Sequence, residues 1–229
     1  MAKSITRRQS IIYAAAGSLA TAAVLGGLNE KSFCQSSEAA YPKPAMLPNP
    51  ESPTVLVAYG TRAGSTMEIA AAIALALENR NFKIHLCPVQ EAAGPKEYSY
   101  IVIGSAIRMG SPLPEVVQYI EKHQTEFAGR PLACFAVHLT NEQDDAISRQ
   151  KRSAYLDPIR KLLNLNHEGY FTGVYNPAKL PFLEVLMGKL MKSPVGDFRD
   201  WNAIRAWGES IFLQESASVL NSRFVTAES

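Results

Sequence analysis

The chain has 229 residues, of which 47% are hydrophobic and 19% are charged, and its formal net charge is +2. This length and composition suit one globular α/β domain with extensions, and the small net charge excludes the strongly basic surface of a typical nucleic-acid-binding protein. We therefore expect no nucleic-acid partner.

The first 40 residues have the composition of a targeting segment. Thr6-Arg7-Arg8-Gln9 precedes a weakly apolar run rich in alanine and glycine, from Ile11 to Leu28. Paired arginines before a mildly hydrophobic run resemble a twin-arginine export signal, and Ser37-Glu38-Ala39 is a small-x-small cleavage site. The alternative is an uncleaved membrane anchor, although the run is poor in leucine and isoleucine. We expect export to the periplasm or another extracytoplasmic compartment, with membrane association left open.

Residues 41–53 are rich in proline and predict an extended tether between this leader and the folded domain. The folded domain is expected over residues 54–215, followed by a tail over 216–229. Two of the three cysteines, Cys87 and Cys134, lie in apolar runs and are expected to be small core residues; with Cys34 they form no metal-ligand spacing.

The stretch from Val55 to Glu78 indicates a binding site. Val55–Tyr59 is an apolar run typical of a buried parallel strand, and a turn of small and hydroxyl residues follows it. A helix is expected to begin at about Ser65, whose hydroxyl would cap the first free N–H groups. Backbone amides at the positive end of a helix dipole favour phosphate, so this turn predicts a phosphate site.

Two common phosphate-binding motifs are absent from this turn, and their absence narrows the kind of phosphate ligand that it could bind. No Gly-Lys-Ser/Thr ending is present, which excludes a nucleoside-triphosphate P-loop, and there is no G-x-G-x-x-G. The residue order resembles the phosphate signature of the flavodoxin family at Tyr59, Thr61, Gly64, Thr66, Ala70 and Ile73. This resemblance implies FMN as cofactor, with its phosphate held by Thr61, Arg62, Ala63, Gly64, Ser65 and Thr66. The alternative is an ordinary strand-to-helix turn rich in glycine and threonine.

Strands and helices alternate along the rest of the domain. Strands are predicted over 82–89, 98–103, 132–139 and 170–175, and helices from Pro112–Pro114, over 146–163 and over 201–212 with Asp200 as the cap. His85 is expected on a polar, solvated strand face. Right-handed crossovers then predict a flavodoxin-like three-layer α/β sandwich, whose five-stranded parallel sheet has the order 2-1-3-4-5.

That order brings two further loops to the same edge of the sheet as the phosphate turn. The family resemblance implies that these loops flank the flavin ring. The first comprises Ser105, Ala106, Ile107, Arg108, Met109 and Gly110, and the second comprises His138, Leu139, Thr140 and Asn141. Arg108 would place positive charge near the ring, or would only steady the loop. Met109 would lie against the ring or fill a gap in the core. His138 would donate to the ring or take no part in the chemistry.

Several segments together resemble the menaquinone-dependent protoporphyrinogen dehydrogenase family. They are Tyr59–Gly64, Ile103–Gly110, Lys122-His123 and Leu186–Met191. The resemblance implies an FMN enzyme that oxidises a porphyrinogen-like or other hydrophobic reductant and passes electrons to a quinone or a redox partner protein. Met109 and Ser111 differ from the tyrosine and histidine usual in that family, so the substrate stays open.

An insertion between Asn176 and Asp200 has no counterpart in a plain flavodoxin. A helix is predicted at about 180–192, with an apolar band that lysines flank. Such a helix could rest on an anionic membrane or receive a porphyrin or quinone, or it could pack on the core or on a second subunit.

Three functions therefore compete. The first is an FMN dehydrogenase, in which the flavin and no catalytic side chain carries the chemistry. The second is an exported electron carrier of the flavodoxin type without a small-molecule substrate, and the third is a binding module that has lost the flavin. The apolar insertion favours the first, export favours the second because haem precursors are made in the cytoplasm, and the intact phosphate signature disfavours the third.

Overall fold

The structure is a computed structural model that describes residues 52–179 and 195–214. The predictions of an export signal over 1–40, a helix over 180–192 and a tail over 216–229 lie outside the described residues, as does nearly all of the tether over 41–53. Within the described ranges, no helix combines the length and the hydropathy needed to cross a membrane.

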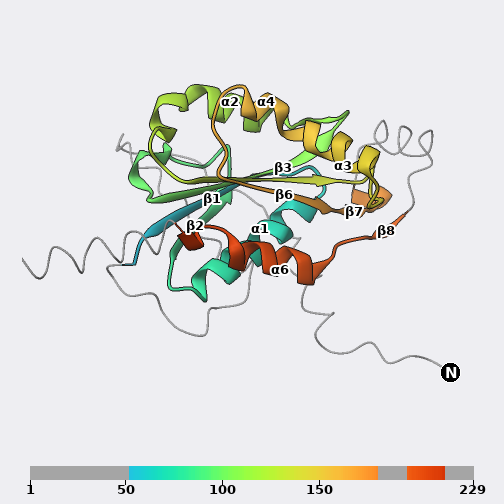
Figure 1. The fold of residues 1–229 in the computed structure, drawn as a ribbon, viewed down its shortest axis with the longest axis horizontal. Coiled ribbons are helices and arrows are strands. Elements are labelled where there is room, and N and C mark those ends of the chain that lie inside the picture. Colours follow the sequence, from blue (N-terminus) through green and yellow to red (C-terminus); the bar gives the residue numbers. More distant parts are fainter. Residues whose placement is uncertain (1–51, 180–194, 215–229) are drawn as a thin grey trace, which may run out of the picture. The chain divides into compact units, whose positions relative to one another are not determined.

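A parallel sheet forms the centre of the domain (Figure 1). Its strands lie in the order β2-β1-β3-β5-β6, which confirms the predicted flavodoxin-like order. The bounds are Thr54–Gly60 for β1, Lys83–Pro88 for β2, Tyr100–Arg108 for β3, Leu132–His138 for β5 and His167–Thr172 for β6. The inner strands β1, β3 and β5 are almost fully buried because helices cover both faces of the sheet.

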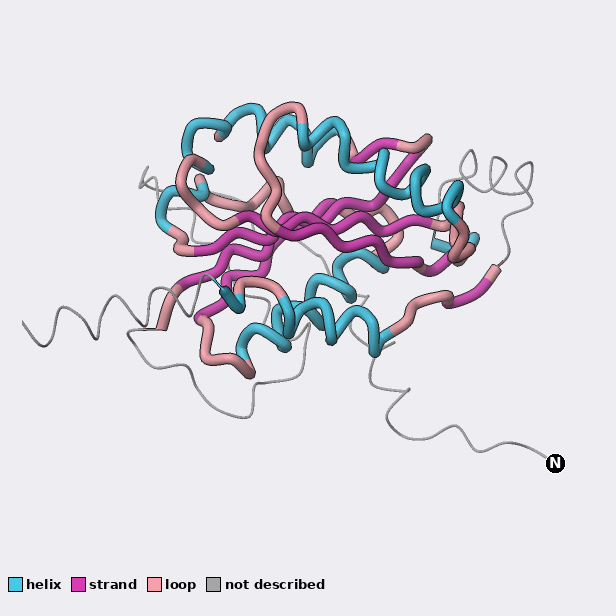
Figure 2. Tube along the Cα trace, viewed as in Figure 1, coloured by secondary structure: helices cyan, strands magenta, loops and turns pink. Residues whose placement is uncertain are grey.

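Helices form the two outer layers (Figures 1 and 2). One layer contains α1 (Ser65–Glu78) and α6 (Trp201–Ser210), and the other contains α2 (Pro114–Lys122), α3 (Ala146–Ser153) and α4 (Asp157–Arg160). Each layer has its own core: Ile73, Phe135 and Ile204 belong to the first, and Ile103 and Ile120 to the second. The predicted cap of α6 is confirmed, since the Asp200 carboxylate accepts from the amides of Asn202 and Ala203 at 3.0 Å.

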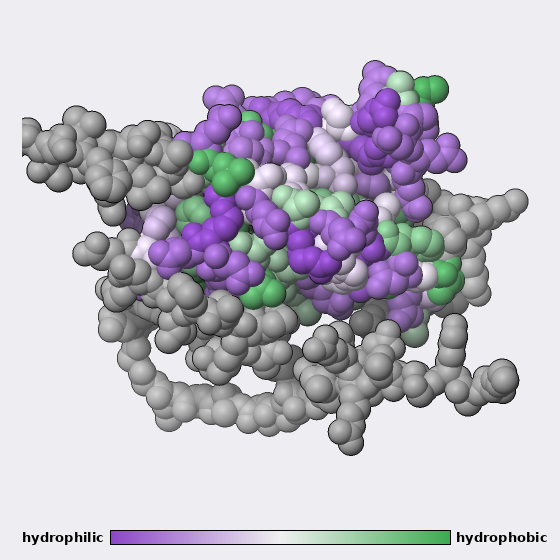
Figure 3. All heavy atoms as spheres, turned by 60° about the horizontal axis from the view of Figure 1, so that its bottom comes forward, coloured by the Kyte–Doolittle hydropathy of each residue, from purple (hydrophilic) through white to green (hydrophobic). Residues whose placement is uncertain are grey.

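Short elements complete the described chain. They are the strands β4 (Ser111–Pro112), β7 (Val174–Tyr175) and β8 (Gly196–Asp197), and the 3₁₀ turns η1 (Pro95–Glu97), η2 (Gln124–Phe127), η3 (Ala154–Leu156) and η4 (Pro177–Lys179). The α1 and α6 side, turned forward in Figure 3, mixes hydrophilic and apolar residues, as expected for helices with one buried face.

Three predicted element boundaries were wrong. β3 runs on through Arg108 and pairs with β4, so residues 105–108 are strand rather than loop. The helix predicted over 146–163 breaks into α3, η3 and α4, because Pro158 has no N–H to continue an α-helical ladder. The last predicted strand divides at Gly173 into β6 and β7, since β7 leaves the sheet to pair with β8.

The prediction of a solvated His85 was also wrong. Its ring is half-buried, and its Nδ1 lies 3.0 Å from the Tyr98 hydroxyl. Burial, with a smaller contribution from nearby Lys83, lowers the pKa of His85. The two cysteines Cys87 and Cys134 are buried in the core, as predicted.

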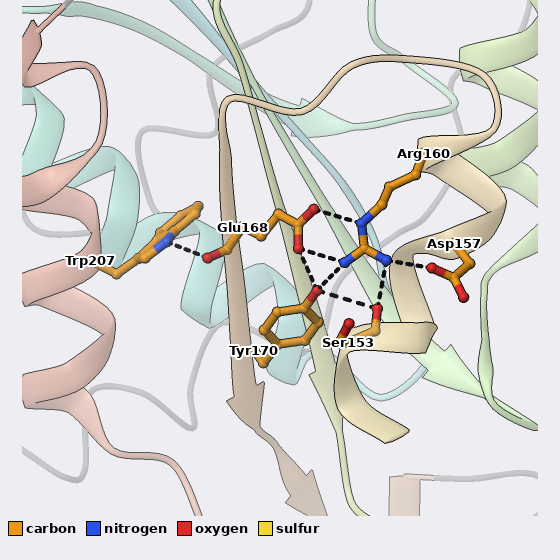
Figure 4. A network of polar contacts seen from close by, with 6 residues as sticks. All are labelled: Ser153, Asp157, Arg160, Glu168, Tyr170 and Trp207. Atoms are coloured by element: carbon orange, nitrogen blue, oxygen red, sulfur yellow. Dashed lines mark hydrogen bonds and ion pairs between the residues drawn. The ribbon is translucent and has the colours of Figure 1, made fainter. Parts of the chain in front are cut away.

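A polar network joins the edge strand β6 to both helical layers (Figure 4). Arg160 of α4 donates to both carboxylate oxygens of Glu168 at 2.7 and 2.6 Å, and to the Tyr170 hydroxyl at 2.8 Å. On the other side, Trp207 of α6 donates through Nε1 to the main-chain oxygen of Glu168 at 3.0 Å. These bonds hold β6, whose one sheet neighbour among the described strands is β5.

Candidate functional site

The turn after β1 is shaped by Gly64, whose φ of 92° lies in the left-handed region. The Gly64 N–H donates to Thr61 Oγ1 at 3.0 Å, which closes the turn. Gly64 is also the N-cap residue of α1, and no side chain caps that helix. The predicted capping by the Ser65 hydroxyl was therefore wrong. The amides of Ser65, Thr66 and Met67 precede the first bond of the helical ladder, which Glu68 N–H makes to the Gly64 oxygen at 3.2 Å, so they form the positive end of a helix dipole.

Thr66 is the clearest sign that a polar group belongs in this turn. Its side chain is fully buried, and its Oγ1 has no hydrogen-bond partner within the described residues. A buried hydroxyl without a partner is costly, unless a ligand satisfies it. The uncapped amides and this hydroxyl lie in the same helical turn, so the residues fit a phosphate group.

Helix α2 supports the phosphate turn from the side. Arg62 Nη2 lies 3.1 Å from Glu115 Oε2, in the first turn of α2. β1 and α2 also approach closely, because a Cβ added at Gly60 would lie 2.5 Å from Val116 Cγ2. Glu115 is not predictable as a site residue from the sequence, since an acidic residue at the start of a helix is common and its partner Arg62 lies 53 positions away.

The second predicted loop is a β-hairpin formed by β3 and β4. Ser105 is buried, and its hydroxyl accepts from the Leu113 N–H at 2.9 Å and donates to the Ala106 oxygen at 2.9 Å. The Ser105 side chain therefore closes the hairpin. At the tip, Met109 and Gly110 have φ values of 51° and 80°. Met109 is 91% exposed, so the alternative that it fills a gap in the core was wrong.

The other residues predicted on this hairpin lie near its tip. Ala106 and Ile107 are partly buried and pack against the core on the α2 side, and Arg108 is exposed. The strand registers place Gly60 opposite Ser105, and Ala106 opposite Val137. The structure thus brings the phosphate turn, the hairpin and the loop after β5 to one edge of the sheet.

The third loop, Leu139–Asn141, is held by Tyr155. The Tyr155 hydroxyl accepts from Asn141 Nδ2 at 2.7 Å and lies 2.9 Å from Thr140 Oγ1. Arg152 further fixes the loop by donating to the main-chain oxygen of Asn141. A hollow of about 330 Å³ is lined by the loop and the start of α3; its residues are Leu139, Thr140, Asn141, Glu142, Gln143 and Ser148.

His138 is buried behind this loop. Its ring lies 5.5 Å from that of Tyr155, and neither ring nitrogen has a hydrogen-bond partner in the described part of the chain. Burial, the main cause, lowers the pKa of His138 to about 4, so the ring is neutral at pH 7. The position next to Tyr155 makes His138 a supporting residue of the third loop.

Gly173 lies beside the phosphate turn, although no pattern in the sequence predicts it there. A Cβ added there would lie 3.3 Å from Ser65 Oγ and 2.9 Å from Val137 Cγ1. Only a glycine fits behind Ser65 without displacing a neighbour.

Among the described residues, no group of histidine, cysteine, aspartate and glutamate side chains could hold a metal ion.

Comparison with known proteins gives one family. The model of the flavodoxin domain family matches residues 56–201 of the chain. A curated relative, the protoporphyrinogen IX dehydrogenase [quinone] of Escherichia coli strain K12, is 28% identical over 100 residues. This match covers 43% of the chain and 55% of the relative, so the chain spans about half the length of the curated relatives it matches.

Solved structures similar to the chain include several flavodoxins. A flavodoxin from the domain Archaea is 14% identical with a TM-score of 0.43, and the match covers 69% of this chain and 95% of that one. The Fusobacterium nucleatum flavodoxin bound to flavin mononucleotide is 13% identical with a TM-score of 0.43, and the match covers 69% of this chain and 96% of that one.

Proposed function

The chain belongs to the flavodoxin domain family, and on that premise we propose that it binds FMN noncovalently and acts as an FMN-dependent oxidoreductase. The observation that carries this proposal is the first turn of α1, where a helix end without a side-chain cap lies together with the buried hydroxyl of Thr66, which has no partner among residues 52–179 and 195–214. Both features suit the phosphate end of a mononucleotide.

Each of the three loops has a role in this proposal. The turn over 61–66 holds the phosphate through its main-chain amides and the Thr66 hydroxyl. The hairpin over 105–110 and the loop over 138–141 flank the flavin ring, and exposed Arg108 places positive charge beside them. When bound, FMN supplies the hydride and electron-transfer chemistry, so the residues of this chain position the cofactor and tune its environment.

The finer function that we propose is a dehydrogenase that takes hydrogen from a porphyrinogen-like, hydrophobic reductant and passes electrons to a quinone. The 28% identity to the protoporphyrinogen IX dehydrogenase [quinone] of Escherichia coli supports this substrate class. Met109 also supports it, because an apolar side chain that is 91% exposed at the hairpin tip suits contact with an apolar partner. We separately propose export through residues 1–40 and membrane contact through 180–192. Export favours the alternative of an electron carrier, because haem precursors are made in the cytoplasm.

Flavin content tests the FMN proposal. The purified protein is expected to be yellow and to release one FMN per chain on denaturation. A preparation that is colourless and stays colourless after FMN is added would refute it.

Turnover separates the dehydrogenase from an electron carrier. Under anaerobic conditions, protoporphyrinogen should reduce the bound flavin, and a soluble quinone analogue should reoxidise it. Normal reduction by dithionite without reduction by protoporphyrinogen would identify an electron carrier.

Export is tested by cell fractionation, in which Arg7→Lys and Arg8→Lys together should retain the protein in the cytoplasm.

A further inference from the structure

A small antiparallel pair of strands lies at the carboxyl end of β6, next to the phosphate turn. β7 and β8, which we call the arm base, pair Val174 with Asp197 and Tyr175 with Gly196. The chain returns from β8 to α6 close to the sheet, because the Phe198 N–H donates to the Gly173 oxygen at 3.2 Å. Since Gly173 packs behind Ser65, the arm base is adjacent to the first turn of α1.

One side chain joins the arm base to that turn. Arg199 donates through Nε and Nη2 to the two carboxylate oxygens of Asp197 at 2.8 and 2.6 Å. Its third nitrogen, Nη1, donates to Glu68 Oε2 at 2.5 Å. The guanidinium also lies 4.4 Å from the centre of the Trp201 ring, and the Arg199 side chain is only 9% exposed. Arg199 is therefore held in one place by two strong ion pairs and an aromatic ring.

The position of Glu68 gives this ion pair a consequence for anion binding. Glu68 lies in the first turn of α1, where its own N–H donates to the Gly64 oxygen at 3.2 Å. An acidic residue here interacts favourably with the positive end of the helix dipole, but its charge would repel a phosphate placed at the same helix end. The Arg199 guanidinium offsets that repulsion.

We infer that Arg199 is a positioning residue for the phosphate end of FMN: it neutralises Glu68 and holds the arm base against the first turn of α1. This inference rests on the proposed FMN function. With Arg199, the three charged groups Glu68, Asp197 and Arg199 carry a net charge of −1. Without it they carry −2, and both carboxylates lose their shared partner.

Four proteins test the inference by their affinities for FMN: the wild type, Arg199→Gln, Glu68→Gln and the double variant Arg199→Gln/Glu68→Gln. Arg199→Gln should bind FMN about fivefold to twentyfold more weakly at low salt, because one added negative charge acts on a dianion across the first helical turn. The double variant restores the net charge of −1, so its affinity should return to within about twofold of the wild type.

Two control ligands separate charge from structural damage. Riboflavin has the same ring without the phosphate, so Arg199→Gln should change its affinity by less than about twofold. The dissociation constant of inorganic phosphate, measured by competition with FMN, should be higher in Arg199→Gln than in the wild type. Salt at about 1 M should reduce the difference, because it screens the partly exposed carboxylates of Glu68 and Asp197.

The outcomes are distinct. FMN binding by the wild type with an unchanged affinity in Arg199→Gln would overturn the inference and leave the proposed function intact. Equal losses for FMN and riboflavin, or no recovery in the double variant, would also overturn it, because a purely structural role predicts both. A wild type that binds no FMN would refute the proposed function itself.

Discussion

Replacing Thr66 by valine should change stability and FMN binding in opposite directions. Valine has nearly the shape of threonine and similar helix propensity, so the substitution removes a hydroxyl with little change in packing. In the protein without FMN, Thr66 Oγ1 is fully buried and has no partner within the described residues. Removing an unsatisfied buried hydroxyl should stabilise that form by about 1 kcal/mol, and by up to about 3 kcal/mol if the hydroxyl is dry.

With FMN bound, the same hydroxyl is expected to donate to a phosphate oxygen. A hydrogen bond to a charged group contributes about 1.5–3 kcal/mol. Because 1.4 kcal/mol is a factor of ten, Thr66→Val should weaken FMN binding by about tenfold to a hundredfold. Riboflavin, which has no phosphate, should bind both proteins equally.

Urea unfolding of the two apoproteins and fluorescence titration with FMN and riboflavin measure these effects. Thr66→Ser is the matched control, since it keeps the hydroxyl and should keep most of the FMN affinity. The reasoning is refuted if Thr66→Val destabilises the apoprotein, because the hydroxyl then has a partner. An unchanged FMN affinity would show that the phosphate lies elsewhere.

Three more predictions concern the fold around the site. Hydrogen bonding from Arg160 lowers the pKa of Glu168, so this pair stabilises the fold above about pH 4.3 and loses its effect as the pH falls through the lowered folded-state pKa. In urea unfolding, Arg160→Met should therefore lower the free energy of unfolding by about 1–3 kcal/mol at pH 7 and by less below pH 4. A loss of stability that does not depend on pH would exclude this cause. A Cβ at Gly104 would lie 2.1 Å from Phe135 Cζ, so Gly104→Ala should lower stability by about 1–3 kcal/mol, and an unchanged melting temperature would contradict the packing. Met109 is exposed at a φ of 51°, so Met109→Gly should be neutral or stabilise the fold by up to about 1 kcal/mol, whereas a clear loss would mean that this side chain packs on the domain.

The order of the sheet was predictable because it follows from local patterns and a chirality rule. Apolar runs such as Val55–Tyr59 are long enough to identify buried strands, and right-handed crossovers leave few ways to connect them. The turn between β1 and α1 was predictable for the same reason, since its residues are consecutive in the chain; that it holds a phosphate stays a prediction. The element boundaries were less predictable, because nothing local signals that β3 continues into a hairpin through Arg108.

The partners of the site residues depend on contacts between distant segments. Glu115 lies 53 positions from Arg62, and Arg199 lies 131 positions from Glu68. No periodic pattern in the sequence predicts such pairs, because each residue by itself is an ordinary charged side chain at a helix or strand end.

The sequence by itself therefore determined the layer architecture and the position of the turn between β1 and α1 that we propose binds phosphate, since both arise from residues close together along the chain. Only the tertiary structure decided that Thr66 is buried without a partner in the part of the chain that is described, that the Ser105 hydroxyl bonds inside the hairpin and that Arg199 pairs with Glu68. The reason is physical: burial and ion pairing depend on which surfaces the fold brings into contact, and these surfaces come from segments far apart in the chain.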